Sequence, residues 1–201
     1  MNPSASHVLW YLSRGSGLVL LVLMSAVVVL GVAVHLRAAP RGWPRFAVAE
    51  VHRSLSLFAI SLLALHTATA VVDPYVTIGW AASVLPFTSR YRPLWVGLGA
   101  LAVDFGAAIV LTSLLRHRLG FRAWKRVHWL AYLAWPSAIA HSLGAGNDLR
   151  LGWVAATVGA CVAAVAVAVG ARLFAVTRRP STSVPSGLAR PPSPVAARTR
   201  Q

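Results

Sequence analysis

The sequence is poor in acidic residues, in charge overall and in cysteine. Its 201 residues contain four Asp and Glu against nineteen Lys and Arg, and 11% of the side chains are charged, whereas soluble domains average about 25%. Cys161 is the only cysteine. A disulfide within the chain, a cysteine-based zinc site and a cysteine-bound iron–sulfur cluster are therefore excluded. No GxGxxG segment follows a strand-like run either, so this chain lacks that type of dinucleotide-binding motif.

Apolar residues take the place of the missing charge and make up 57% of the sequence. A helix needs about 20 predominantly apolar residues to cross a bilayer. Five stretches are long enough, with Pro, Gly or Asn between them: 9–34, 48–72, 93–115, 124–144 and 151–176. We therefore expect an all-α integral membrane protein, a bundle of five transmembrane helices within a domain over 9–176. The mixed aromatic segment 76–92 is expected to be an interfacial loop.

Lys and Arg are distributed unevenly between the loops. Fifteen of the nineteen lie in or beside the first loop, the third loop and the C-terminal end, and four lie on the other side of the predicted membrane. Because basic loops stay in the cytoplasm, we expect a multi-pass protein of the cell membrane with residues 1–8 outside. The basic, Pro-rich segment 177–201 is expected to be a disordered cytoplasmic tail. Topology thus accounts for the charge, and no nucleic-acid partner is expected.

Four of the seven histidines lie inside predicted spans, where ionisable residues are rare and usually functional. His52 and His66 are fourteen residues apart on the second span, and His128 and His141 are thirteen apart on the fourth. These spacings correspond to about 21 and 20 Å along a helix axis. Because the second and fourth spans run in the same direction, the sequence predicts two facing pairs at two depths. We name them after the predicted orientation: the inner pair is His52 with His128, and the outer pair is His66 with His141.

Each pair has the ligands that one haem iron needs, one imidazole from each of two facing helices. An iron bound by two histidines has no open position, which indicates electron transfer rather than gas binding. On ideal helices His52 and His66 share a face, whereas His128 and His141 point about 140° apart. Pro136 lies between the latter two and is a candidate for a compensating kink.

Two other interpretations of the histidines stay open. They could be hydrogen-bonded polar links in a haem-free transporter or structural membrane subunit. They could also bind zinc or copper, although Glu50 near His52 is the one further ligand at a matching depth.

Arginines near the two pairs are candidates to bind haem propionates. Arg53 and Arg126 are beside the inner pair, where positive-inside topology also accounts for them. Near the outer pair the candidates are Arg14, Arg90 and Arg92. Asp104, in the third span, is given no role.

Four motifs stand together in this chain: His52-x13-His66, His128-x12-His141, the opening Trp10-Tyr11-Leu12-Ser13-Arg14 and the stretch Trp124-Lys125-Arg126-Val127-His128-Trp129. With them, residues from about 8 to 175 resemble the ferric reductase-like transmembrane domain, the haem-binding core shared by iron reductases and NADPH oxidases. The resemblance implies two b haems that carry electrons across the membrane. His52 and His128 would bind the cytoplasmic haem, and His66 and His141 the outer one.

The resemblance also implies which partners to expect. Reductases of this type carry a flavin and nicotinamide module, and a folded domain needs at least about 50 residues, more than the Pro-rich segment provides. FAD and NAD(P)H are therefore expected only on a separate partner, if at all. We expect an oxidoreductase, or its membrane subunit, that takes electrons from a cytoplasmic flavoprotein or quinol. The acceptor at the outer face would be ferric iron in a chelate or, alternatively, an extracytoplasmic oxidoreductase. The family often has six spans, and five are expected here.

Overall fold

The computed structural model describes residues 3–74, 76, 78–146 and 150–178, and the regular secondary structure in these ranges is helical. The predicted tail from 179 onward lies outside them. The helices are α1 (Pro3–Leu36), α2 (Arg45–Val72), α3 (Trp80–Val84), α4 (Pro93–Leu114), α5 (Arg116–His128), α6 (Ala131–Ala145) and α7 (Gly152–Thr177).

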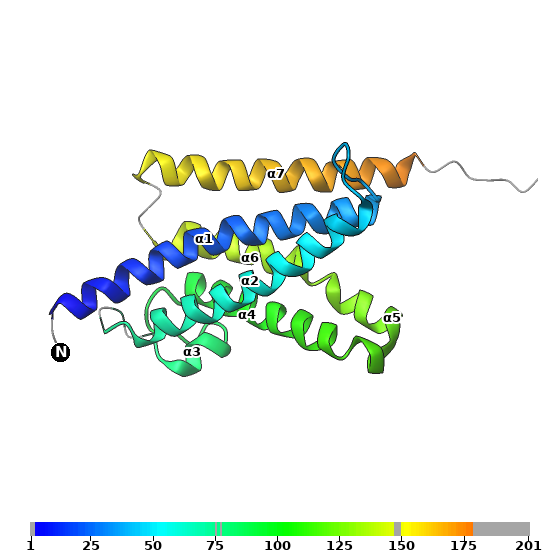
Figure 1. Ribbon diagram of the computed structural model, residues 1–201. Coiled ribbons are helices and arrows are strands. Elements are labelled where there is room, and N and C mark those ends of the chain that lie inside the picture. The colour runs from blue at the N-terminus through cyan, green and yellow to red at the C-terminus, as the bar shows by residue number, and fades with distance from the viewer. Residues whose placement is uncertain (1–2, 75, 77, 147–149, 179–201) are drawn as a thin grey trace, which may run out of the picture.

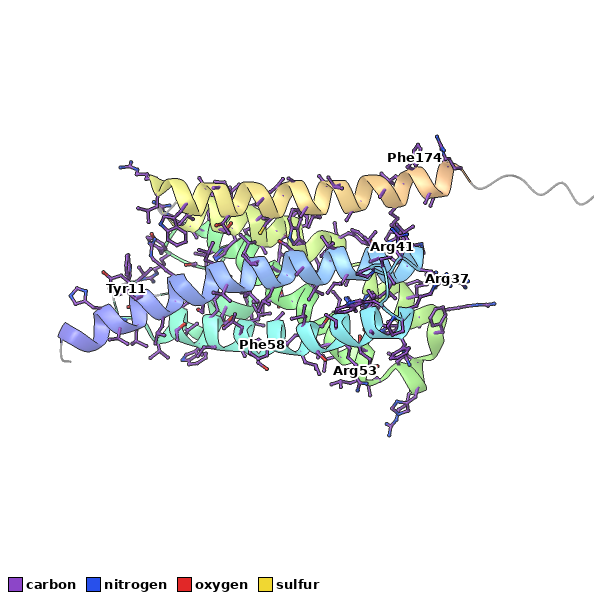
Figure 2. All side chains as sticks on the ribbon, turned by 45° about the horizontal axis from the view of Figure 1, so that its top comes forward. Tyr11, Arg37, Arg41, Arg53, Phe58 and Phe174 are labelled. Carbon is purple, nitrogen blue, oxygen red and sulfur yellow. The ribbon has the colours of Figure 1, made fainter. Side chains whose placement is uncertain are left out.

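Four helices within the described ranges, α1, α2, α4 and α7, are long and apolar enough to cross a membrane. Their outward surfaces carry large apolar side chains: Phe46 and Phe58 on α2 are 72% and 69% exposed. Figure 2 shows Phe58 pointing away from the bundle. Apolar surface on this scale suits contact with lipid rather than water. The chain is thus a multi-pass helical membrane protein.

Along the chain α1, α2, α4, α6 and α7 alternate in direction, so that α1, α4 and α7 run one way and α2 and α6 the other (Figure 1). α1 packs against α2 on one side and α7 on the other, and α4 packs against α6. α2 and α6 run the same way, as the sequence predicts for its second and fourth spans. Arg37, Arg41 and Arg53 lie toward the end of the bundle where α7 finishes, and Tyr11 lies toward the opposite end (Figure 2).

The structure differs from the prediction over 124–144, where two helices replace one span. α5 begins well before this stretch and has no buried residue, and α6 is only 15 residues long. Between them the chain tightens: Leu130 donates to the carbonyl of Val127, and Leu133 to that of Leu130. Bonds across three residues are those of a 3₁₀ turn. Pro136, the candidate for a compensating kink, lies inside α6, and the tightening precedes it.

The predicted interfacial loop 76–92 contains the five-residue helix α3 and otherwise lacks regular structure where it is described. Arg92 ends it with a left-handed backbone (φ 41°) just before Pro93 starts α4. The Arg92 guanidinium donates to the carbonyl of Gly144 near the end of α6. This contact ties the start of α4 to the end of α6.

A small apolar core joins α1, α6 and α7. It consists of Leu21, Ile139, Val154 and Val158. Beside it the Trp135 indole donates to the buried Ser25 hydroxyl over 2.9 Å, which fixes α6 against α1. Because this core is confined to one side of the bundle, it leaves room between α1, α2, α4 and α6.

Candidate functional site

The structure brings the four histidines of the predicted spans together as two facing pairs. The ring centroids of His52 and His128 are 6.4 Å apart, and those of His66 and His141 are 6.3 Å apart. The ring planes cross at 71° and 79°. Each pair joins one histidine of α2 to one of the α5–α6 segment, at two levels of the bundle.

The 3₁₀ turn explains how His128 and His141 can serve the same side of the bundle. A residue in a 3₁₀ turn rotates the chain by about 120°, whereas a residue in an α-helix rotates it by about 100°. Four bonds of this type, from the N–H groups of Trp129, Leu130, Tyr132 and Leu133, would add roughly 80° and bring the two side chains to about 60° of one another. The tight turn therefore removes most of the 140° mismatch of an ideal helix.

One continuous cavity of about 1530 Å³ contains both pairs. Pockets for a single drug-sized ligand have volumes of about 300–1,000 Å³. The cavity runs between α1, α2, α4 and α6, with α5 and α7 also contributing to its wall, Arg172 of α7 included. It is lined mostly by apolar and small side chains, with the four histidines projecting into it. Its size and lining suit more than one large, flat, apolar group.

Three of the four histidines donate a hydrogen bond to a backbone carbonyl of a neighbouring helix. The Nδ1 atoms of His52, His66 and His141 lie 3.1, 2.9 and 2.8 Å from carbonyl oxygens. The acceptors are the carbonyls of Val27 and Ser13 on α1 and of Trp95 on α4.

A glycine follows each of these carbonyls by four residues, one helical turn further on. A Cβ atom at Gly17 would lie 2.9 Å from the His66 ring, and one at Gly31 would lie 3.3 Å from the His52 ring. At Gly99 the Cβ would be 2.6 Å from the Nδ1 atom of His141. In a helix, residues four apart share a face, so the missing side chain opens the carbonyl to the imidazole. We call each unit of carbonyl and glycine a notch.

The notches fix which nitrogen of each imidazole carries the proton. A carbonyl can only accept, so Nδ1 must be protonated in the neutral ring and Nε2 is left with its lone pair. A histidine that donates its other nitrogen to a carbonyl is the usual form of a metal-bound histidine. The notches therefore present Nε2 as the nitrogen able to bind metal.

His128 differs from the other three. Its Nδ1 is buried and has no hydrogen-bond partner among the described residues. The ring stacks instead on Trp124 of its own helix, at 5.0 Å and 31°. The Trp124 indole donates over 3.1 Å to the hydroxyl of Ser113. Ser113 is fourteen residues after Gly99, the same interval that separates Gly31 from Gly17.

The residues present fit haem. Imidazole nitrogens bind metals at about 2.0–2.1 Å, so two rings on opposite sides of one ion have centroids about 6 Å apart. Both observed separations meet this value. In the described part of the chain, no three His, Cys, Asp or Glu side chains gather as a metal site would require. Haem iron, by contrast, needs only one or two axial ligands from a protein, and a pair of imidazoles can supply both.

The candidate arginines are placed differently from one another. Arg14 and Arg53 line the cavity, whereas Arg126 lines a separate surface groove with Phe121, Arg122, Lys125 and Trp129. Arg92 contacts the Gly144 carbonyl, and Arg90 is exposed. Asp104 is half-buried on α4, and nothing in the structure assigns it a role.

The notches are the functional feature that sequence reasoning missed. Their signal is visible once the histidines are known: Gly17 and Gly31 are fourteen residues apart, as are His52 and His66. Two antiparallel helices in contact can repeat the same interaction at one such interval. Only the packing of α1 against α2 shows that these glycines face the histidines.

Comparison with family models gives one match. Residues 16–139, more than half of the chain, match the model described as ferric reductase like transmembrane component. The matched range includes His52, His66 and His128 and ends two residues before His141. Comparison with curated proteins and with solved structures finds no match.

Proposed function

We propose that this chain, which belongs to the ferric reductase-like transmembrane family, carries electrons across a membrane by holding two b haems between α2 and the α5–α6 segment. The observation that carries the proposal is the pair of imidazole separations, 6.4 and 6.3 Å, at two levels of one cavity. His52 and His128 would hold the inner group, and His66 and His141 the outer one.

A haem bound by two histidines supplies reversible one-electron exchange without an open coordination site. The chain's own residues do the rest. The carbonyls of Val27, Ser13 and Trp95 hold three imidazoles in the tautomer that offers Nε2. Apolar cavity walls exclude water from the space between the helices. Arg14 and Arg53 line the cavity near its two ends, where they would bind the anionic propionates.

The direction proposed for the electrons follows from the charge asymmetry. The basic loops support an orientation with the inner pair on the cytoplasmic side and residues 1–8 outside. The donor is then either a cytoplasmic flavoprotein, which would carry FAD and take electrons from NAD(P)H, or a quinol. The acceptor at the outer pair is a ferric chelate or an extracytoplasmic oxidoreductase.

The proposal is tested with the purified chain in detergent, prepared from haem-replete cells. The dithionite-reduced minus oxidised spectrum and pyridine haemochrome quantification should give about two b haems per chain, one for each bis-histidine site. A variant with both His66→Ala and His141→Ala should keep about one. The matched control is His7→Ala, an exposed α1 histidine outside the cavity, which should keep both.

A folded, monodisperse preparation without haem would contradict the proposal. The four histidines would then act as polar links between helices, as in a haem-free transporter or structural subunit. Retention of both haems in the double variant would show instead that the outer pair is not a binding site.

A further inference from the structure

His128 is the one histidine of the two pairs that no notch holds in place, so other contacts must orient its ring. The other three imidazoles are held by a carbonyl on a neighbouring helix. His128 has no such partner in the described residues, and its only ring neighbours there are His52 and Trp124. It is also the last residue of α5, directly before the 3₁₀ turn. Any change in that turn would therefore move the imidazole.

The side chain of Arg172, on the distant helix α7, contacts this turn. The Arg172 guanidinium of α7 lies over the ring of Trp129 at 4.3 Å and over that of Tyr132 at 5.3 Å. It also donates a hydrogen bond to the Tyr132 hydroxyl. Trp129 and Tyr132 form the tight turn itself, since Tyr132 donates to the carbonyl of Trp129 over 3.0 Å.

A half-buried cation in a membrane helix is costly unless it is paired, so its place requires a reason. Stacking on two aromatic rings together with a hydrogen bond uses the planar guanidinium in a way that lysine cannot reproduce. Positive-inside topology accounts for the charge of Arg172 but not for these contacts. The matched control is the residue that directly follows this helix: Arg178 is exposed, and the one ring it contacts in the described part of the chain is that of Phe174 on α7, at 4.2 Å.

We propose that Arg172 is the positioning residue of His128. By fixing the 3₁₀ turn, it sets the direction of the imidazole that lacks a notch, and so it governs the inner site alone. This inference rests on the proposed function. It also gives α7 a role, although α7 supplies no histidine and lies beyond the range matched by the family model.

The test is a potentiometric titration of the wild type and of Arg172→Gln, combined with low-spin EPR, which reports the angle between axial imidazole planes. We expect the midpoint potential and EPR signal of one haem to change or disappear, with the other unchanged. The changed component should be the one that survives in the His66→Ala, His141→Ala variant. Arg178→Gln should match the wild type, and Arg172→Lys should restore the signal only in part.

If Arg172→Gln does not fold, Tyr132→Phe replaces it, because it deletes only the hydroxyl contact. A smaller shift of the same component is expected. Unchanged spectra, or equal shifts of both components, would overturn the inference and leave the two-haem proposal intact. A wild-type protein without haem would overturn both.

Discussion

The outer and inner pairs consist of the same residue type and have nearly the same ring separation, but their surroundings differ. In the outer pair both imidazoles occupy a notch, and His66 has a further neighbour in the Ser16 hydroxyl at 3.4 Å. In the inner pair only His52 does, and His128 is stacked on Trp124 instead. Ligand identity alone therefore does not describe these sites, because the partner of the second ring nitrogen differs between them.

The difference has an electronic consequence. A carbonyl that accepts from Nδ1–H makes the imidazole a stronger donor to the metal. Two strong donors favour the oxidised iron more than one does, since second-shell hydrogen bonds tune the potential of a haem. On this basis the outer site is expected to have the lower potential and to hold its histidines more rigidly. The proposed inner-to-outer step would then be uphill, so net flow would depend on the acceptor having a higher potential than both haems.

The largest effect is expected from filling the notches of the outer pair. In Gly99→Ala the new Cβ would press on the Nδ1 of His141, and in Gly17→Ala on the ring of His66. Losing an outer-shell partner weakens metal sites by about 10- to 100-fold, so the outer haem should be lost selectively, as haem titration would record. Gly159→Ala on α7 is the control, because a Cβ there meets nothing within 4 Å and Gly159 does not line the cavity. Equal loss of both haems would contradict the idea that the notches at Gly99 and Gly17 serve the outer pair alone.

A smaller effect is expected at the inner pair. The Cβ of Gly31→Ala would lie 3.3 Å from the His52 ring, a contact that slight movement relieves. Inner-site affinity should fall by less than about tenfold, and the outer haem should be unaffected. The same titration measures this. A loss of affinity as severe as that of Gly99→Ala would show that the distance from the new Cβ to the histidine ring does not determine the size of the effect.

The Trp124 stack offers a subtler way to perturb the inner pair. Ser113→Ala removes the acceptor of the indole N–H, which is worth about 0.5–1.5 kcal/mol. Trp124 should then be less fixed over His128, and the inner EPR signal should broaden while the outer signal stays sharp. A change in the outer signal alone would contradict the link from Ser113 through Trp124 to His128.

The smallest effect is expected from Ser16→Ala. The Ser16 hydroxyl is 3.4 Å from the His66 Nδ1, and the Ser13 carbonyl, at 2.9 Å, remains in the variant. Thermal unfolding and the outer midpoint potential should stay close to the wild type, within the roughly 0.5 kcal/mol typical of substitutions away from key contacts. A large shift would show that the hydroxyl, rather than the carbonyl, holds His66.

Much of this architecture follows from the sequence. The apolar runs predict α1, α2, α4 and α7 to within a few residues, apart from the start of α1, because length and composition decide whether a helix can span a bilayer. The pairing of the histidines follows from helix direction and rise per residue. Neither inference needs any knowledge of side-chain contacts.

The rest depends on contacts between distant segments. The sequence at Trp129–Leu130 contains no Gly or Pro, so nothing local predicts the turn that divides the expected fourth span. Arg172, which contacts this turn, is forty residues from Tyr132 in the sequence. The notches could not be predicted for the same reason, because only the packing of α1 against α2 brings Gly17 and Gly31 next to the histidines.

α1 contributes no histidine to either pair, yet it holds one histidine at each level of the bundle. It does so with two identical units fourteen residues apart, on a helix without a break. Such a helix acts as a ruler between the two sites. Inserting or deleting one residue anywhere between Gly17 and Gly31 would leave its hydropathy almost unchanged but rotate one unit by about 100° relative to the other. The length of this stretch is thus constrained far more tightly than its composition.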